Sequence, residues 1–398
     1  MIAFLRLGWF NRRRMLVYSR ILVFASLLSL GWFFIAATGS QGSDFLAFWS
    51  AAKLVVSGAA ATAYDPVLLG KIQAAAGHND VFAFVNPPPL LLVVWPLGFL
   101  GYPAAWVVWI AVTYALWLGA MRRRNRELSW PVAAYPGALL AAWHAQTGFL
   151  TSAIQAVAAD LLGKRPFLAG LFVGGLIVKP HLAVLFPVAF LAGRHWRAIA
   201  GAAASVAGLL VLSWLVFGSA TMLAYPQSWR VSQYLLTTGS DVFFLRQVTV
   251  YAAVRVALSS QAALAAQAVA TTTMGVLIWR AWSRAGPIDG KLALLFAATP
   301  LATPYLFSYD LPFLALPFCW LLTAERQRGF PGWSRTMLLL LYVSPLVARA
   351  LALPVGADIM PLVSLATVWW VWRRLGERSG PNPLAEGDVH PVRQDEIG

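Results

Sequence analysis

Residues 21–38 are ILVFASLLSLGWFFIAAT, an uncharged apolar stretch that follows the basic cluster Arg12-Arg13-Arg14. A stretch of about 18 or more apolar residues is typical of a helix that spans a bilayer. Backbone amides in lipid must be hydrogen-bonded within the protein, and a single stretch achieves this only as a helix. Because no clear small-residue cleavage site follows, we predict a retained signal-anchor helix over residues 20–38 rather than a removed signal peptide.

The composition of the whole chain indicates a membrane protein. Of the 398 residues, 60% are apolar and 11% are charged, whereas soluble domains are about half apolar and a quarter charged. We predict an all-α integral membrane protein, a polytopic helical bundle of about 12 spans. The predicted spans after the first are 103–121, 131–143, 149–163, 166–178, 180–192, 198–217, 262–282, 291–303, 311–324, 337–351 and 360–372.

The net charge of +15 is distributed as short basic clusters between the apolar runs, such as 122–126 and Arg373-Arg374. This pattern is typical of cytoplasmic loops and argues against a nucleic-acid partner. All clusters fall on one side, with both termini cytoplasmic, if the short segment 87–100 is re-entrant. If that segment crosses fully, cluster 122–126 changes side unless 131–143 fails to cross. The single cysteine, Cys319, excludes an intrachain disulfide framework.

Two long loops, 39–86 and 218–261, then face the periplasm. In the first loop, Phe45, Phe48 and Trp49 recur at helical spacing, which predicts a helix lying on the membrane surface over residues 43–56. We expect the second loop to carry surface helices as well. We divide the chain into a membrane domain, residues 1–375, and a disordered cytoplasmic tail, residues 376–398.

Polar groups at membrane depth are costly, so each is a functional hypothesis. The threading places one set on the periplasmic side: Asp44, Asn86, His144, Gln146, Lys179, His181, Arg230, Asp241, Arg246 and Asp310. Alternatives remain open, since Asp44 and Asp310 could cap helices and Lys179 could reach the membrane interface. The histidines could be ordinary interfacial residues, and the arginines loop charges. Metal-ligand spacings and Gly-rich phosphate loops are missing from the sequence, so we expect no metal and no cofactor.

Several segments, taken in order, resemble glycosyltransferase family 87, whose members are membrane enzymes with the type-C glycosyltransferase fold. They are residues 44–52 continuing to Tyr64-Asp65, residues 86–90 with Trp95-Pro96-Leu97, residues 170–180, and Thr303-Pro304-Tyr305 leading to Tyr309-Asp310-Leu311. The resemblance implies a polyprenyl-phosphate-linked sugar donor and inverting transfer. It also implies a multi-pass protein of the bacterial inner membrane whose active site faces the periplasm. Family members include polyprenyl-phosphate-mannose-dependent α-mannosyltransferases.

The resemblance also implies roles for particular residues. The family's base is an acid that directly follows the first span, and Asp44 occupies this position. We expect Lys179, Arg246 and Arg230 to bind the donor phosphate. We expect the remaining substrate contacts from Trp49, Tyr64, Asn86, Gln146, His181, Tyr309 and Asp310. Two departures from the family pattern are that Leu311 replaces a histidine and that Ala145-Gln146 replaces a Gly-Gln pair.

The sequence thus predicts a glycosyltransferase that moves a hexose, with mannose implied, to a periplasmic lipid or glycan acceptor. The alternative is a multi-span lipid or solute transporter or flippase. That class uses charges at the bilayer midplane and broken helices in two related halves. Pro180 interrupts an apolar run as that class requires, but the chain shows no persuasive internal repeat and its polar groups gather on one side.

Overall fold

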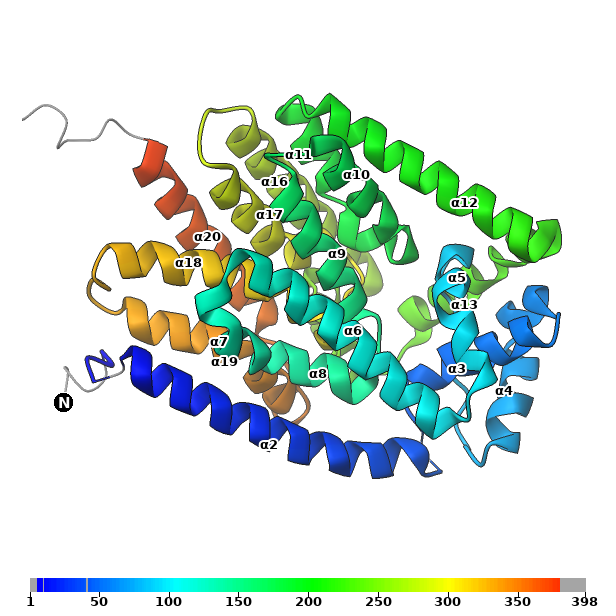
Figure 1. The fold of residues 1–398 in the computed structure, drawn as a ribbon. Helices are drawn as coiled ribbons and strands as arrows, with labels where there is room; N and C mark the ends of the chain where they lie inside the picture. Colours follow the sequence, from blue (N-terminus) through cyan, green and yellow to red (C-terminus); the bar gives the residue numbers. More distant parts are fainter. Residues whose placement is uncertain (1–5, 10, 41, 380–398) are drawn as a thin grey trace, which may run out of the picture.

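The computed structural model describes residues 6–9, 11–40 and 42–379. Their regular structure is helical, and the one bridge of β type in this part of the chain joins Gln247 and Phe307. Figure 1 shows the helices side by side in one bundle, crossed at its edges by two long helices, α2 and α12. Each predicted span coincides with a helix or with a pair of short helices.

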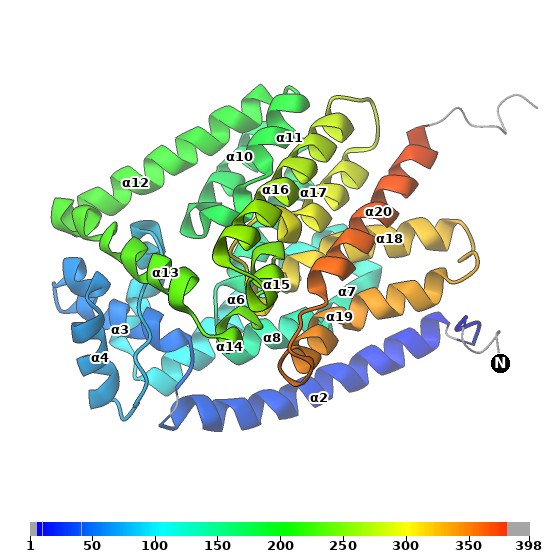
Figure 2. The ribbon, with the colours of Figure 1, turned by 180° about the vertical axis from the view of Figure 1, so that it is seen from behind.

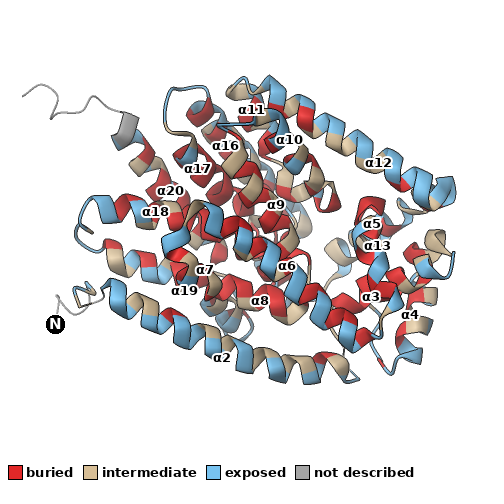
Figure 3. Ribbon diagram, viewed as in Figure 1, coloured by how far each residue is buried: buried red, intermediate tan, exposed pale blue. Residues whose placement is uncertain are grey.

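Five helices of the described chain are long and apolar enough to cross a membrane: α2 (Arg12–Thr38), α6 (Tyr102–Arg124), α12 (Trp196–Ala224), α16 (Ser260–Trp282) and α19 (Ser334–Val355). Helices α2 and α12 lie on opposite edges and expose most of their apolar side chains (Figure 3). Apolar surface in water costs about 25 cal/mol per Å², whereas lipid removes this cost. These helices make the chain an integral membrane helical protein.

The other predicted spans are shorter or broken, except for α20, which is one helix of 20 residues. They are α7 (Ser129–Ala133) with α8 (Pro136–His144), α9 (Gly148–Leu161), α10 (Pro166–Gly175) with η5 (Leu176–Val178), η6 (Pro180–Ala183) with α11 (Phe186–Ala192), α17 (Ile288–Ala302), η7 (Ser308–Leu314) with α18 (Ala315–Gln327), and α20 (Met360–Ser379). Pro136 explains the break between α7 and α8, because proline lacks the amide that continues a helix. A helix of 15 residues is about 22 Å long, less than a bilayer core of about 30 Å. The count of twelve therefore stays a prediction.

Close helix packing in the bundle depends on small residues. Helices α10 and α12 pack backbone to backbone at Gly170 and Gly201. A Cβ on Gly170 would lie 2.0 Å from the Ala198 oxygen, and one on Gly201 would lie 2.1 Å from the Phe167 oxygen. Small residues at such crossings are the usual means by which helices associate in membranes.

One end of the bundle carries the basic clusters, and we call it the basic end. Ion pairs hold several elements there: Arg124 with Asp289 at 2.6 Å, Arg326 with Glu127 at 2.9 Å, and Arg374 with the buried Glu325. The opposite end, which we call the loop end, carries both long loops. Figures 1 and 2 show α3, α4 and α13 together at this end, away from the N-terminus.

The first loop is packed inside the protein, and the prediction of a membrane-surface helix there is wrong. It contains α3 (Phe45–Val56), η1 (Ala60–Tyr64) and α4 (Pro66–Ala75), and the short segment 87–100 that follows contains η2 (Pro88–Leu90), α5 (Leu91–Val94) and η3 (Trp95–Phe99). Most residues of α3 are buried. Phe45 and Phe48 pack on Trp109 of α6, and Gly98 lets η3 approach the backbone of Ala52. The apolar face of α3 therefore meets protein rather than lipid.

The second loop contains α13 (Gln227–Thr238), α14 (Asp241–Phe244) and α15 (Val250–Ala257). Ser228 is the buried residue of α13, whereas Trp229 and Tyr234 are exposed. At the basic end, η4 (Arg126–Leu128) joins α6 to α7. Helix α20 continues to Ser379, so the start of the predicted disordered tail is helical, with Arg374 paired to Glu377 one turn on. The rest of that tail, 380–398, lies outside the described residues.

The two ends make the orientation testable. In a Cys319→Ala background, Asp80→Cys at the loop end should react with a membrane-impermeant maleimide added to intact cells. Lys164→Cys at the basic end should react only after the cells are permeabilised, because the basic end is expected to be cytoplasmic. Both side chains are exposed, so burial does not bias the comparison. Labelling of position 164 in intact cells would show that the orientation is opposite to the one predicted.

Candidate active site

Asp44 contacts His144 across the loop end. Its Oδ2 lies 2.9 Å from Nδ1 of His144, and the two side chains are 29% and 27% exposed. Asp44 precedes α3 but makes no side-chain bond to that helix, so the capping alternative is wrong for this residue. His144 ends α8, where Ala145 takes a left-handed φ of 47° and turns the chain toward α9. The carboxylate is therefore oriented by a side chain from another helix.

Lys179 and Asp310 form a buried ion pair beside this contact. The Lys179 Nζ lies 2.6 Å from Asp310 Oδ1, and the side chains are 8% and 1% exposed. Lys179 is thus paired inside the protein, which overturns the alternative that it reaches the membrane interface. Asp310 also accepts a bond from the Phe307 amide at 3.4 Å, so its capping alternative holds in part. Burial raises the pKa of the Asp310 carboxyl, while the Lys179 ammonium lowers it.

Tyr309 joins the two pairs. Its ring centroid lies 5.1 Å from that of His144, and the Lys179 ammonium lies 4.9 Å from the Tyr309 ring. Burial raises the pKa of the Tyr309 phenol, and the charges of Asp44 and Asp310 add to this effect. Tyr309 therefore stays a hydroxyl at neutral pH. We call Asp44, His144, Lys179, Tyr309 and Asp310 the loop-end cluster.

A short backbone pairing places Arg246 next to this cluster. The Ser308 amide donates to the Arg246 oxygen at 3.2 Å, and the Val248 amide donates to the Leu306 oxygen at 2.9 Å. The second loop is thereby fixed along the chain that leads into η7. The Arg246 charge acts on Tyr309, and its side chain is exposed. Arg246 is a cation of the site that is open to a ligand.

Two further predicted site residues support Lys179 rather than face solvent. The Tyr64 hydroxyl donates to the backbone oxygen of Asn86 at 3.1 Å, and the side-chain Nδ2 of Asn86 donates to the backbone oxygen of Val178 at 3.2 Å. Both side chains are buried. This chain of hydrogen bonds ends one residue before Lys179, so it fixes the backbone from which the ammonium projects.

The other predicted site residues have separate contacts. Trp49 is buried and donates to the Leu100 oxygen at 3.0 Å. Gln146 accepts from the Thr147 amide at 3.3 Å, and the His181 ring lies 5.8 Å from that of Tyr305. Arg230 is exposed on α13. No hydrogen bond, ion pair or ring contact in the described part of the chain joins Trp49, Gln146 or Arg230 to the loop-end cluster.

Within residues 6–9, 11–40 and 42–379, no group of three or more His, Cys, Asp or Glu side chains forms a metal-binding set. The residue that sequence reasoning underrated is His144. The sequence predicts His144 at the outer turn but assigns it no role in the site, although His144 is the direct partner of Asp44. Its position at the end of a helix on the same side as Asp44 was the available signal.

Comparison with known families decides what kind of protein carries this cluster. A family model described as glycosyltransferase family 87 matches residues 84–304, more than half of the chain. The chain belongs to glycosyltransferase family 87. This family 87 enzyme therefore transfers a sugar from a donor to an acceptor.

The matched residues of the family 87 enzyme include His144, Lys179 and Arg246, while Asp44 and Asp310 lie outside the match. Neither the curated proteins nor the solved structures contain a match to the chain.

The buried ion pair predicts non-additive effects on stability. Lys179→Met alone should lower the free energy of unfolding by about 3–5 kcal/mol, because it leaves the Asp310 carboxyl buried without its partner. Combined with Asp310→Asn, the loss should be smaller than that of Lys179→Met alone. Unfolding in detergent followed by circular dichroism measures both. Costs that simply add would show that the two charges do not stabilise each other.

Proposed function

We propose that the enzyme transfers a hexose, with mannose the sugar that the family resemblance implies, from a polyprenyl-phosphate donor to a lipid or glycan acceptor. The proposal rests mainly on the contact between Asp44 and His144 beside the buried Lys179–Asp310 pair. We infer that this cluster lies on the periplasmic side of the bacterial inner membrane, since it is opposite the basic end.

Asp44 is the general base in this proposal. It is partly exposed, so an acceptor hydroxyl can reach it. With His144 Nδ1 as donor, Oδ2 is held and the second carboxylate oxygen is left for the acceptor. The acceptor oxygen attacks the anomeric carbon while its proton passes to Asp44. The bond from the anomeric carbon to the phosphate oxygen breaks, its electron pair leaves with the polyprenyl phosphate, and the configuration inverts.

The leaving phosphate gains negative charge, which nearby cations stabilise. Sequence reasoning assigned this role to Lys179, Arg246 and Arg230. The ammonium of Lys179 is already paired with Asp310, and the two charges cancel. Arg246 lies next to the cluster and is exposed, and within the described residues no ion pair joins its side chain to an acid. We therefore propose Arg246 as the main phosphate ligand. Lys179 has a supporting role, because its ammonium holds Asp310 and the Tyr309 ring in place.

The transporter alternative has less support. Family membership makes the chain an enzyme, and the described charges at the loop end lie together instead of along two related halves. The partial exposure of Asp44 supports an acceptor that approaches the cluster from the loop end.

Asp44→Asn is the sharpest test of the base. The amide keeps the size of the side chain and its bond to His144 but cannot take a proton, so turnover should fall roughly 10²–10⁴-fold. Because Asp44 caps no helix, the melting temperature should barely change for Asp44→Asn or Asp44→Ala. Turnover is measured with radiolabelled polyprenyl-phosphate mannose and a membrane extract as acceptor source. An Asp44→Asn enzyme of normal activity would rule out the base.

Arg246→Gln tests the phosphate assignment. Loss of one charged hydrogen bond costs about 1.5–3 kcal/mol, so the donor KM should rise at least tenfold with little change in acceptor KM. Arg230→Gln is the comparison, since Arg230 is a similar exposed arginine on the other part of the same loop. A larger effect at position 230 than at position 246 would transfer the role to Arg230.

A further inference from the structure

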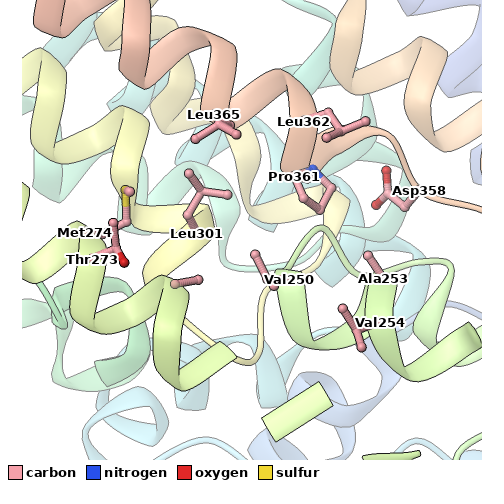
Figure 4. A pocket seen from close by; sticks show the side chains of 11 residues that line it. Val250, Ala253, Val254, Thr273, Met274, Leu301, Asp358, Pro361, Leu362 and Leu365 are labelled. Atoms are coloured by element: carbon pink, nitrogen blue, oxygen red, sulfur yellow. The ribbon is translucent and has the colours of Figure 1, made fainter. Parts of the chain in front are cut away.

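A groove opens between α15, α16 and α20, outside the loop-end cluster. Its volume is about 470 Å³, which is within the range of about 300–1,000 Å³ found for ligand pockets. Figure 4 shows Leu362 and Leu365 of α20 on one side and Val250 of α15 on the other, with Asp358 at one end and Met274 at the other. Leu362 and Leu365 are exposed, so the groove is open along its length.

The wall formed by α16 is held in place by buried hydrogen bonds. The side-chain Nε2 of Gln267 donates to the Leu301 oxygen, and the side-chain Oε1 of Gln267 accepts from the Tyr251 backbone amide, both at 2.9 Å. The Thr271 hydroxyl donates to the Ala302 oxygen at 2.9 Å. These bonds tie α16 to the end of α17 and to α15. They also satisfy the local polar groups, so the groove itself presents an almost entirely apolar, preformed surface.

The groove has a direction relative to the membrane. Asp358 lies in the turn between α19 and α20 at the loop end, whereas Ala270 and Met274 lie in the middle of the candidate span α16. A molecule in the groove would therefore have one end at the loop end and would extend into apolar depth. A long hydrocarbon chain with a polar head group has this shape.

Charged groups lie between the groove and the loop-end cluster. Arg349 of α19 is close enough to Asp358 and to Arg246 for their charges to interact. Asp358 also accepts a bond from the Met360 amide at 2.8 Å. The charge of Arg246 in turn acts on Tyr309 of the loop-end cluster.

We propose that this groove binds the isoprenoid chain of the lipid-linked donor. The inference rests on the proposed function for the identity of the lipid. The apolar groove fits the chain, the exposed Arg246 fits the phosphate, and the partly exposed Asp44 lies in the loop-end cluster, where the sugar must be.

Photocrosslinking tests the groove without any turnover. The full chain is placed in bilayer nanodiscs with a polyprenyl phosphate that carries a diazirine on its isoprenoid chain, and labelled residues are found by mass spectrometry. Labels should fall on α16 and α20 around Ala270 and Leu365. Excess unlabelled polyprenyl phosphate should remove them, and excess bilayer phospholipid should not. Labels elsewhere, or equal displacement by phospholipid, would overturn the proposal.

Matched variants sharpen the result. Ala270→Trp fills the groove, whereas Val269→Trp places the same ring on the exposed neighbouring position that does not line it. We expect labelling to fall about tenfold in Ala270→Trp and to stay unchanged in Val269→Trp. Leu365→Trp, on α20, should behave like Ala270→Trp, and melting temperatures check that all three fold. Equal labelling of Ala270→Trp and Val269→Trp would contradict the groove.

Crosslinks in the groove of a protein that transfers no sugar from this donor would support the groove and refute the proposed function. Sugar transfer with crosslinks elsewhere would refute the groove and support the proposed function.

Discussion

The buried pair of Lys179 and Asp310 is the constraint on which the arrangement of the loop end depends. Two charges that are almost fully shielded from water must lie together, because separating them leaves each one desolvated and unpaired. The pair fixes the turn between η5 and η6 against η7. Tyr309 is thereby placed between Lys179 and His144, and the backbone of η7 is placed where Arg246 can pair with Ser308.

Much of the helical architecture was predictable from the sequence, because long apolar runs have few other options in lipid. Residues 20–38 and 103–121 are two such runs, and α2 and α6 contain them. The environment of α3 was not predictable in the same way. Helical spacing of Phe45, Phe48 and Trp49 indicates one apolar face, but it does not say whether lipid or protein covers that face. Here protein covers both faces, since α3 is enclosed by α6 and η3.

The composition of the candidate site was easier to predict than its pairings. Asp44, Lys179 and Asp310 were identified because charges are rare in apolar surroundings. Their partners lie 100 and 131 positions away in the chain. Local sequence patterns do not predict contacts between residues so far apart in sequence. Tyr64 and Asn86 illustrate the same limit. Their residue types suit sugar binding, yet the fold uses both to brace the segment before Lys179.

The two carboxylates of the cluster differ in a way that separates their proposed roles. Asp310 is enclosed and bound to Lys179, so it cannot meet an acceptor hydroxyl without breaking a buried ion pair. Asp44 is partly exposed, and the described chain gives it a histidine partner that leaves one carboxylate oxygen unoccupied. When two nearby carboxyl groups have different surroundings, they usually have different roles in an active site. On this argument the enclosed acid positions the site, and the exposed acid is the one that can take a proton from an arriving acceptor.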